Sequence, residues 1–237
     1  MSSTFTPVST PNNKLTNRTL GVVGGMGVQA TARFYSMLTN NQSVTTEQEY
    51  LDVLIYSKSS IPDRTAFITG KTSTSPLGPL LNAAKVLEEA GVGCIAMPCV
   101  SAHFFYDDLA CAVSVPFINM MDETAKYVQD KEFGKIGLLA TDGTLHGRLF
   151  HKAFAKQGID VVLPGSKAQQ YLSDVIYQLK RGDMPTCALD KISADLYDLD
   201  AQAIVLGCTE LGLLHKSSGY IYIEALEVLA NAALAMQ

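Results

Sequence analysis

The sequence predicts an α/β protein built from two similar halves that face each other across a cleft. Three observations predict this fold class. Short apolar runs alternate with longer amphipathic segments, the apolar runs are mostly apolar on both faces, and the order of motifs in the first half returns in the second. We therefore expect mainly parallel sheets covered by helices.

Seven apolar runs are predicted to form strands. They cover 20–25, 51–57, 93–98, 116–120, 135–141, 159–164 and 203–208. The segments between them carry apolar residues at helical spacing and predict helices. These cover 28–40, 78–90, 145–157, 167–181 and 186–198, and a closing helix is predicted over 223–236.

The internal repeat places two cysteines in equivalent positions. A strand with a small-residue turn at 20–27 precedes a strand that ends in a cysteine at 93–103, and the same order returns at 135–144 and 203–212. Ligands of open α/β sheets bind beyond the carboxyl ends of the strands. Both cysteines are therefore predicted to point into the cleft between the halves.

The domain prediction follows from the same repeat. We expect a first α/β domain over 18–115 and a second over 116–222, and the C-terminal helix over 223–237 is a candidate to pack back on the first domain. Residues 1–17 are polar and rich in Ser, Thr, Pro and Asn, so a flexible N-terminal tail is expected there.

Composition narrows the class of partner. The 237 residues include 18 basic and 23 acidic side chains, a net charge of −5, with no dense Lys/Arg cluster. Nucleic acid and membrane are therefore not expected as partners, whereas a small-molecule substrate is. The five cysteines have no metal-type spacing with the four histidines, and an odd count without an apolar leader favours free thiols in a cytoplasmic protein that needs no metal.

Cys99 and Cys208 are the predicted catalytic pair. Inverting the α-carbon of an amino acid removes a proton from one face and delivers one to the other, so two acid/base groups must flank the carbon. Each cysteine lies where a strand gives way to a predicted helix, whose positive end favours a thiolate. The other cysteines, Cys94, Cys111 and Cys187, are interpreted as small buried hydrophobic residues.

Neighbouring residues supply support and substrate contacts. His103 and Glu210 are candidates to hold or relay a proton for the adjacent sulfur, although His103 is equally compatible with capping or cross-linking a helix. Ser101 and Thr209 offer hydroxyl and backbone N–H groups to a substrate carboxylate. A carboxylate held there would also stabilise the charge that develops on proton removal.

Five segments resemble the signatures of the aspartate/glutamate racemase family, specifically its aspartate racemase branch. They are GGMGVQAT (24–31), SIPDRT (60–65), MPCVSAH (97–103), ATDGT (140–144) and LGCTEL (206–211). The resemblance runs from about residue 19 to the C-terminus. It implies two α/β domains related by pseudo-twofold symmetry, one catalytic cysteine from each, no pyridoxal phosphate or other cofactor, and a homodimer. Glu210 in place of histidine points to the aspartate branch.

The resemblance also implies a set of substrate contacts. Arg64, from the PDRT segment, is expected to contact the substrate, and the turn at Met26 and Gly27 is expected to expose backbone N–H groups to it. Thr141 and Thr144 are further candidates, with a role as turn formers as the alternative. Lys167 is a candidate second cation for the distal carboxylate of the substrate.

Three segments depart from the family pattern. Val100 and Ser101 follow Cys99 where the family has Asn-Thr, Val28 follows Gly27 where the family has proline, and Ile223-Glu224 replaces Ile-Asp. Valine cannot replace the hydrogen bonds of an amide. The first hypothesis is therefore a cofactor-independent racemase of aspartate or a related acidic amino acid. The alternatives are a relative with another amino-acid or small-diacid substrate, such as an isomerase or decarboxylase, and a binding protein that keeps the cleft without turnover.

Overall fold

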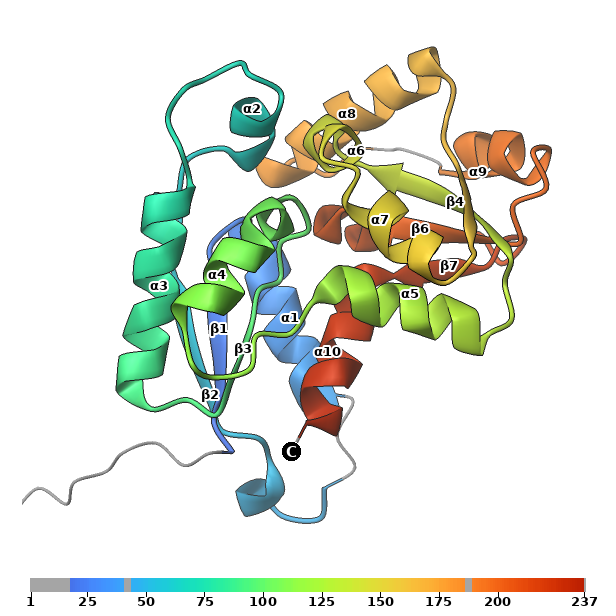
Figure 1. Ribbon diagram of the computed structural model, residues 1–237. Coiled ribbons are helices and arrows are strands. Elements are labelled where there is room, and N and C mark those ends of the chain that lie inside the picture. Colours follow the sequence, from blue (N-terminus) through green and yellow to red (C-terminus); the bar gives the residue numbers. More distant parts are fainter. Residues whose placement is uncertain (1–17, 41–43, 186–188, 237) are drawn as a thin grey trace, which may run out of the picture.

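The computed structural model describes residues 18–40, 44–185 and 189–236. Two parallel sheets form its centre, which confirms the predicted fold class (Figure 1). The first sheet has the order β2-β1-β3 and the second has the order β5-β4-β6-β7. The predicted tail over 1–17 lies outside the described residues, and so does Cys187.

Strand bounds follow the predicted apolar runs closely. Those of the first sheet are β1 (Leu20–Gly24), β2 (Val53–Ser57) and β3 (Cys94–Ala96). Those of the second sheet are β4 (Lys135–Ala140), β5 (Asp160–Val162), β6 (Ala203–Gly207) and β7 (Tyr222–Glu224). Every residue of β1 and β6 is buried, because both strands lie inside a sheet that is covered on both faces.

Helices connect the strands and cover the sheets. Those that follow the first-sheet strands are α1 (Val28–Asn40), α2 (Arg64–Ile68), α3 (Leu77–Ala90) and α4 (Tyr106–Ala112). The remainder are α5 (Met120–Asp130), α6 (Asp142–His146), α7 (Leu149–Lys156), α8 (Ser166–Lys180), α9 (Asp190–Tyr197) and α10 (Ala225–Ala235). Three short 3₁₀ turns complete the described elements, namely η1 (Glu47–Glu49), η2 (Ser101–Phe105) and η3 (Thr209–Leu213).

The strand predicted over 116–120 is wrong. Only Phe117 bridges to Ile95 of β3, and the chain then enters α5 at Met120. The side chain of Asn119 accepts hydrogen bonds from the backbone N–H groups of Met121 and Asp122, which is an N-terminal helix cap. This cap starts the helix before a strand can lengthen.

The closing helix begins later than predicted. Residues 222–224 form β7, which pairs in parallel with β6, and α10 begins only at Ala225. The alternating sequence YIYIE at 220–224 suits an edge strand better than a helix. Helix α10 packs against α1 and α5, and Figure 1 shows it between the two sheets. The predicted domain boundaries stay a prediction.

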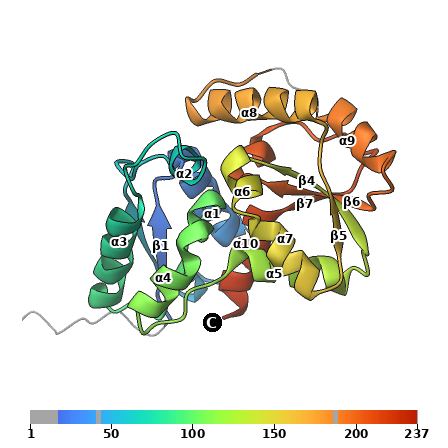
Figure 2. The same ribbon diagram turned by 45° about the horizontal axis from the view of Figure 1, so that its top comes forward.

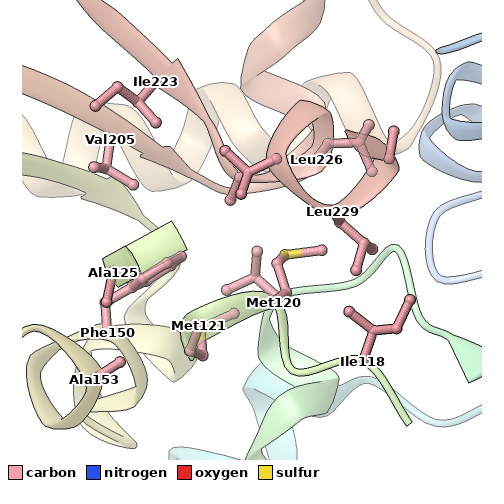
Figure 3. Close-up of a cluster of buried hydrophobic side chains, with 14 of the residues drawn as sticks. Ile118, Met120, Met121, Ala125, Phe150, Ala153, Val205, Ile223, Leu226 and Leu229 are labelled. Atoms are coloured by element: carbon pink, nitrogen blue, oxygen red, sulfur yellow. The ribbon is translucent and has the colours of Figure 1, made fainter. Parts of the chain in front are cut away.

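One hydrophobic cluster joins the layers of both sheets. Figure 3 shows side chains from α5, α7, β6, β7 and α10 that meet in it, among them Met120, Phe150, Val205 and Leu229. Leu20 and Val22 of β1 belong to the same cluster. Two further clusters lie within the layers of the first and of the second sheet. The shared cluster fixes how the carboxyl ends of the two sheets face each other.

Candidate active site

Cys99 and Cys208 line one cavity, although they come from different sheets. Cys99 follows β3 and Cys208 follows β6 directly, and each residue is 4% exposed. The cavity residues are Met26, Cys99, Val100, Ser101, Thr141, Thr144, Lys180, Gly207, Cys208, Thr209 and Glu210. The structure therefore brings nine of the sequence-predicted site residues together.

The cavity is nearly closed. Its volume is about 10 Å³, which is roughly the space that one water molecule needs. An amino acid therefore enters only when elements around the cavity move apart. Helix α2 from the first half lies against α6 of the second at this place (Figure 2).

The contact between α2 and α6 is close. A Cβ atom at Gly143 of α6 would lie 2.8 Å from the Thr65 Cα atom, so only glycine fits there without displacement. The Thr65 hydroxyl lies 3.4 Å from the Thr141 hydroxyl, which lies 3.0 Å from that of Thr144. Thr141 also caps α6, because its side chain accepts from the Thr144 N–H group. These two threonines thus form the turn and line the cavity.

Cys208 is held as a thiol. Its Sγ atom donates a hydrogen bond of 3.1 Å to Oε2 of Glu210, which also accepts from the Thr209 hydroxyl at 3.0 Å. Burial and the neighbouring Glu210 carboxylate raise the pKa of Cys208 well above its ordinary value. The second oxygen of Glu210, Oε1, is buried without a hydrogen-bond partner. A Cβ atom at Gly27 would lie 3.0 Å from it, which places Gly27 at the cavity wall.

The turn after Cys99 is held by His103. The Nδ1–H group of His103 donates to the Cys99 carbonyl at 2.9 Å, and the Met120 N–H group donates to Nε2 at 3.3 Å. Both ring nitrogens therefore bind backbone atoms. Burial lowers the pKa of His103 to about 4, so the ring is neutral at pH 7. These contacts favour the cross-link over the acid/base role that was the alternative for His103.

A 3₁₀ turn follows each of the two cysteines. After Cys99 the five-residue turn η2 leads directly into α4, so the predicted helix is present there, whereas after Cys208 the five-residue turn η3 stands without an α-helix. The Sγ atom of Cys99 lies 3.7 Å from the Ser101 hydroxyl. A short turn has a smaller dipole than a full helix, and the pKa of Cys208 follows its burial and its neighbour Glu210.

The sequence predicted Lys167 as a second cation near the substrate, but the lysine that lines the cavity is Lys180. Lys180 lies in the last turn of α8 and lines the cavity, whereas Lys167 is exposed at the first turn beside a separate surface groove. The two residues are about 20 Å apart along the helix. Helix α8 crosses above the second sheet toward η3 and α2 (Figures 1 and 2), so its last turn reaches the cavity. Burial lowers the pKa of Lys180, but attraction to Cys208, Glu210 and Cys99 outweighs it, and the net pKa is raised.

Arg64 is buried and does not line the cavity, although its charge acts on the cavity residue Lys180. The Nη1 group of Arg64 donates to the carbonyls of Ile61 and Pro62 at 3.1 and 2.9 Å, and its buried Nε atom has no hydrogen-bond partner. Arg64 could also have formed an ion pair at the surface, but its side chain is buried. Arg64 belongs to α2, and a movement of α2 would also move this guanidinium.

The other candidate residues are not part of the cavity. Cys94 is buried in β3, but Cys111 is exposed, so the prediction that Cys111 is buried is wrong. In the part of the chain that the structure describes, no group of histidine, cysteine and acidic side chains is arranged to hold a metal ion. Over the same residues, no helix combines the length and apolar character needed to span a bilayer.

The chain is similar in sequence and fold to known racemases. The family model described as Asp/Glu/Hydantoin racemase matches residues 23–233. The chain is 25% identical over 225 residues to the broad specificity amino-acid racemase RacX of Bacillus subtilis (strain 168), covering 91% of this chain and 96% of that protein.

Solved structures show the same similarity. The aspartate racemase of Picrophilus torridus is 25% identical, with a TM-score of 0.80 over 92% of this chain and 94% of that one. An aspartate racemase homologue from Pyrococcus horikoshii OT3 has a TM-score of 0.76 at 23% identity, over 92% of this chain and 98% of that one.

Proposed function

Because the chain belongs to the Asp/Glu/hydantoin racemase family, we propose that it interconverts L- and D-aspartate, or a related acidic amino acid, by proton transfer between Cys99 and Cys208. The observation that carries this proposal is that two buried cysteines from separate sheets line the same cavity. A carbon atom between them would meet one sulfur on each face, as a two-base inversion requires.

The proton starts on Cys208 in the resting site. Its S–H group donates a hydrogen bond to Glu210, and burial and that carboxylate raise the pKa of the thiol. Cys208 is therefore the proton donor. Cys99 then acts as the thiolate. It takes the α-proton, the C–H electron pair stays on the α-carbon and its carboxylate, and Cys208 delivers its proton to the opposite face. The opposite enantiomer reacts with the two roles exchanged.

Lys180 is proposed to neutralise negative charge in the closed site. Its raised pKa keeps the ammonium group charged, and the same lysine interacts with both sulfurs and with Glu210. A cation at this place would bind a substrate carboxylate and stabilise the charge that develops on the α-carbon. The Thr141, Thr144 and Thr209 hydroxyls, which line the cavity, complete the polar side of the site.

Val100 favours a second candidate, a racemase of wider substrate range. Val100 lines the cavity and is 3% exposed, so an apolar side chain occupies the place where the family resemblance implies an amide. An apolar wall provides no hydrogen bond to a second carboxylate and tolerates an aliphatic side chain. The similarity to an amino-acid racemase of broad specificity is in line with this second candidate.

The first experiment is proton NMR of L-aspartate and L-glutamate with the reduced protein in D2O, followed by chiral chromatography. We expect the α-proton signal to disappear as the D-enantiomer forms. A panel of aliphatic L-amino acids under the same conditions tests the second candidate. If no amino acid in either set exchanges its α-proton with folded, reduced protein, the racemase proposal is wrong.

Cysteine variants test the two-base mechanism. Cys99→Ala and Cys208→Ala should each reduce racemisation by at least about 1,000-fold, because each removes one of two required acid/base groups. Cys94→Ala is the matched control, since Cys94 is equally buried but lies in β3 away from the cavity. Substantial racemisation by either of the first two variants would contradict the mechanism.

We also propose that the protein forms a homodimer and that it is cytoplasmic. The homodimer follows from the family resemblance, and the location from the odd number of cysteines in the sequence. Analytical ultracentrifugation of the purified protein measures the oligomeric state, and a monomer at micromolar concentration would contradict the first of them.

A further inference from the structure

Three charged side chains gather beneath the turn that follows Cys208. Glu224, at the end of β7, is 6% exposed, and its Oε2 atom lies 2.6 Å from Nη1 of Arg33. Its Oε1 atom contacts Nζ of Lys216. The Arg33 and Glu224 atoms form no hydrogen bond of standard geometry, so their contact is an ion pair. One buried carboxylate thus holds two cations.

The cluster connects the layers of the two sheets. Arg33 belongs to α1, which follows β1 of the first sheet, whereas Glu224 belongs to β7 of the second sheet. Burial lowers the pKa of Arg33 and of Lys216, while Glu227 acts in the opposite direction on both. A buried ion pair that loses one partner leaves an uncompensated charge, which is strongly destabilising at that place.

The cluster lies directly against η3. A Cβ atom at Gly212 would overlap both Nη1 of Arg33 and Oε2 of Glu224, so the ion pair packs against the backbone of this turn. The same turn carries Glu210, whose side chain accepts the Cys208 S–H bond. At the start of α1, Gly27 approaches Oε1 of Glu210. Helix α1 therefore meets η3 at two places, next to the cavity and at the ion pair.

We propose that Glu224 is a positioning residue for Cys208. Paired with Arg33 and Lys216, it fixes η3 against α1 and so holds Cys208 and Glu210 in place across the cavity from Cys99. The catalytic consequence rests on the proposed racemase function, but the positioning itself does not. Loss of the Glu224 charge should loosen the turn around Cys208 and leave Cys99 in place.

Alkylation of the individual cysteines measures this directly. Iodoacetamide labelling at one pH, followed by mass spectrometry of the peptides, gives a separate rate for each thiol. In Glu224→Gln we expect the Cys208 rate to rise at least about five-fold, while the rates of Cys99 and Cys94 change less than about two-fold, because a local opening exposes only its own segment. Exposed Cys111 is the reference for reagent reactivity.

Two further variants and a control separate positioning from general stability. Glu224→Asp keeps the charge and should give a smaller change than Glu224→Gln. Gly212→Ala keeps all three charges but displaces the turn, and should accelerate labelling of Cys208 as Glu224→Gln does. Lys156→Met removes an exposed ion pair to Asp122 and should change none of the four rates. If Cys208, Cys99 and Cys94 accelerate together, or if no rate changes in Glu224→Gln, the proposal is wrong.

Kinetics supply the second measurement. With a racemised substrate, Glu224→Gln should lower kcat at least about ten-fold while KM changes less than about three-fold, because the displaced group acts in the proton transfer. If the wild-type protein racemises no amino acid, the proposed function fails. The alkylation rates still decide whether Glu224 positions Cys208.

Discussion

At the scale of single residues, the two cysteines differ in their surroundings. The Cys208 thiol donates a hydrogen bond to the carboxylate of Glu210, whereas the carbonyl of Cys99 accepts a hydrogen bond from the neutral ring of His103. The equivalent positions in the repeat thus have different hydrogen-bond partners, and only at Cys208 does a neighbouring carboxylate help to raise the pKa of the thiol. Side chains two to four positions away in the sequence, Glu210 and His103, make these contacts.

His103 makes stability depend on pH. Its pKa is about 4 in the folded protein, lowered by burial from 6.5. Between these values the unfolded chain binds a proton that the folded protein does not, so the free energy of unfolding should fall as pH decreases from 6.5 to 4. The loss is about 3 kcal/mol, since each pKa unit corresponds to about 1.4 kcal/mol. Urea unfolding at a series of pH values measures it.

His103→Gln isolates this contribution. Glutamine offers one donor and one acceptor to the Cys99 carbonyl and the Met120 N–H group but does not titrate, so the pH dependence assigned to His103 should disappear. Racemisation should stay within about five-fold of the wild type if the residue only cross-links. His215→Gln is the control, because it makes the same substitution at an exposed histidine. A loss of activity in His103→Gln as large as that of Cys99→Ala would restore the acid/base role.

Val100→Asn tests what the apolar cavity wall does. An amide at this position should raise kcat/KM for aspartate about ten-fold or more, because a hydrogen bond to a charged group contributes about 1.5–3 kcal/mol. Steady-state racemisation of aspartate and of an aliphatic amino acid, measured in both proteins, gives the result. Equal kcat/KM values for aspartate would mean that the Cys99 turn is built around another substrate.

At the scale of elements, α2 packs closely against α6, which carries the cavity residue Thr144. Gly143→Ala should lower the free energy of unfolding by about 1–3 kcal/mol, because the new methyl group has no space against Thr65. It should also raise KM for the substrate, since α2 carries Arg64. Thermal or urea unfolding and steady-state kinetics measure the two effects.

Gly78→Ala in α3 is the matched control. A Cβ atom there meets nothing within 4 Å, so the alanine should stabilise the helix by about 0.5–1 kcal/mol. If Gly143→Ala is as stable and as active as Gly78→Ala, α2 and α6 are not in close contact in solution.

At the scale of the whole molecule, one hydrophobic cluster couples the two sheets. Leu229 of α10 is fully buried in it, beside Ile118 and Met120 of the connection between the halves (Figure 3). Leu229→Ala should lower the free energy of unfolding by about 2–5 kcal/mol, and the protein should still unfold in one transition. Leu199→Ala, at an exposed position, should change it by less than about 0.5 kcal/mol. Two separate transitions would show that the halves fold independently.

The sequence by itself determined the fold class and most strands, and it singled out the proposed catalytic pair. Buried parallel strands are apolar along their whole length, so local composition marks them, and the repeated strand-then-cysteine order pairs Cys99 with Cys208. The short elements were less predictable. The capping of α5 by Asn119 and the pairing of β7 with β6 depend on contacts that local periodicity does not contain.

Only the tertiary structure decided which charges surround the site. The choice of Lys180 over Lys167 depends on the direction in which α8 crosses the second sheet, and both lysines look alike in the sequence of the helix. Glu224 and Arg33 lie 191 positions apart and meet because α1 and β7 pack together. Charge interactions act through space, so side chains that are distant in the chain come to lie near the two cysteines that the sequence singles out.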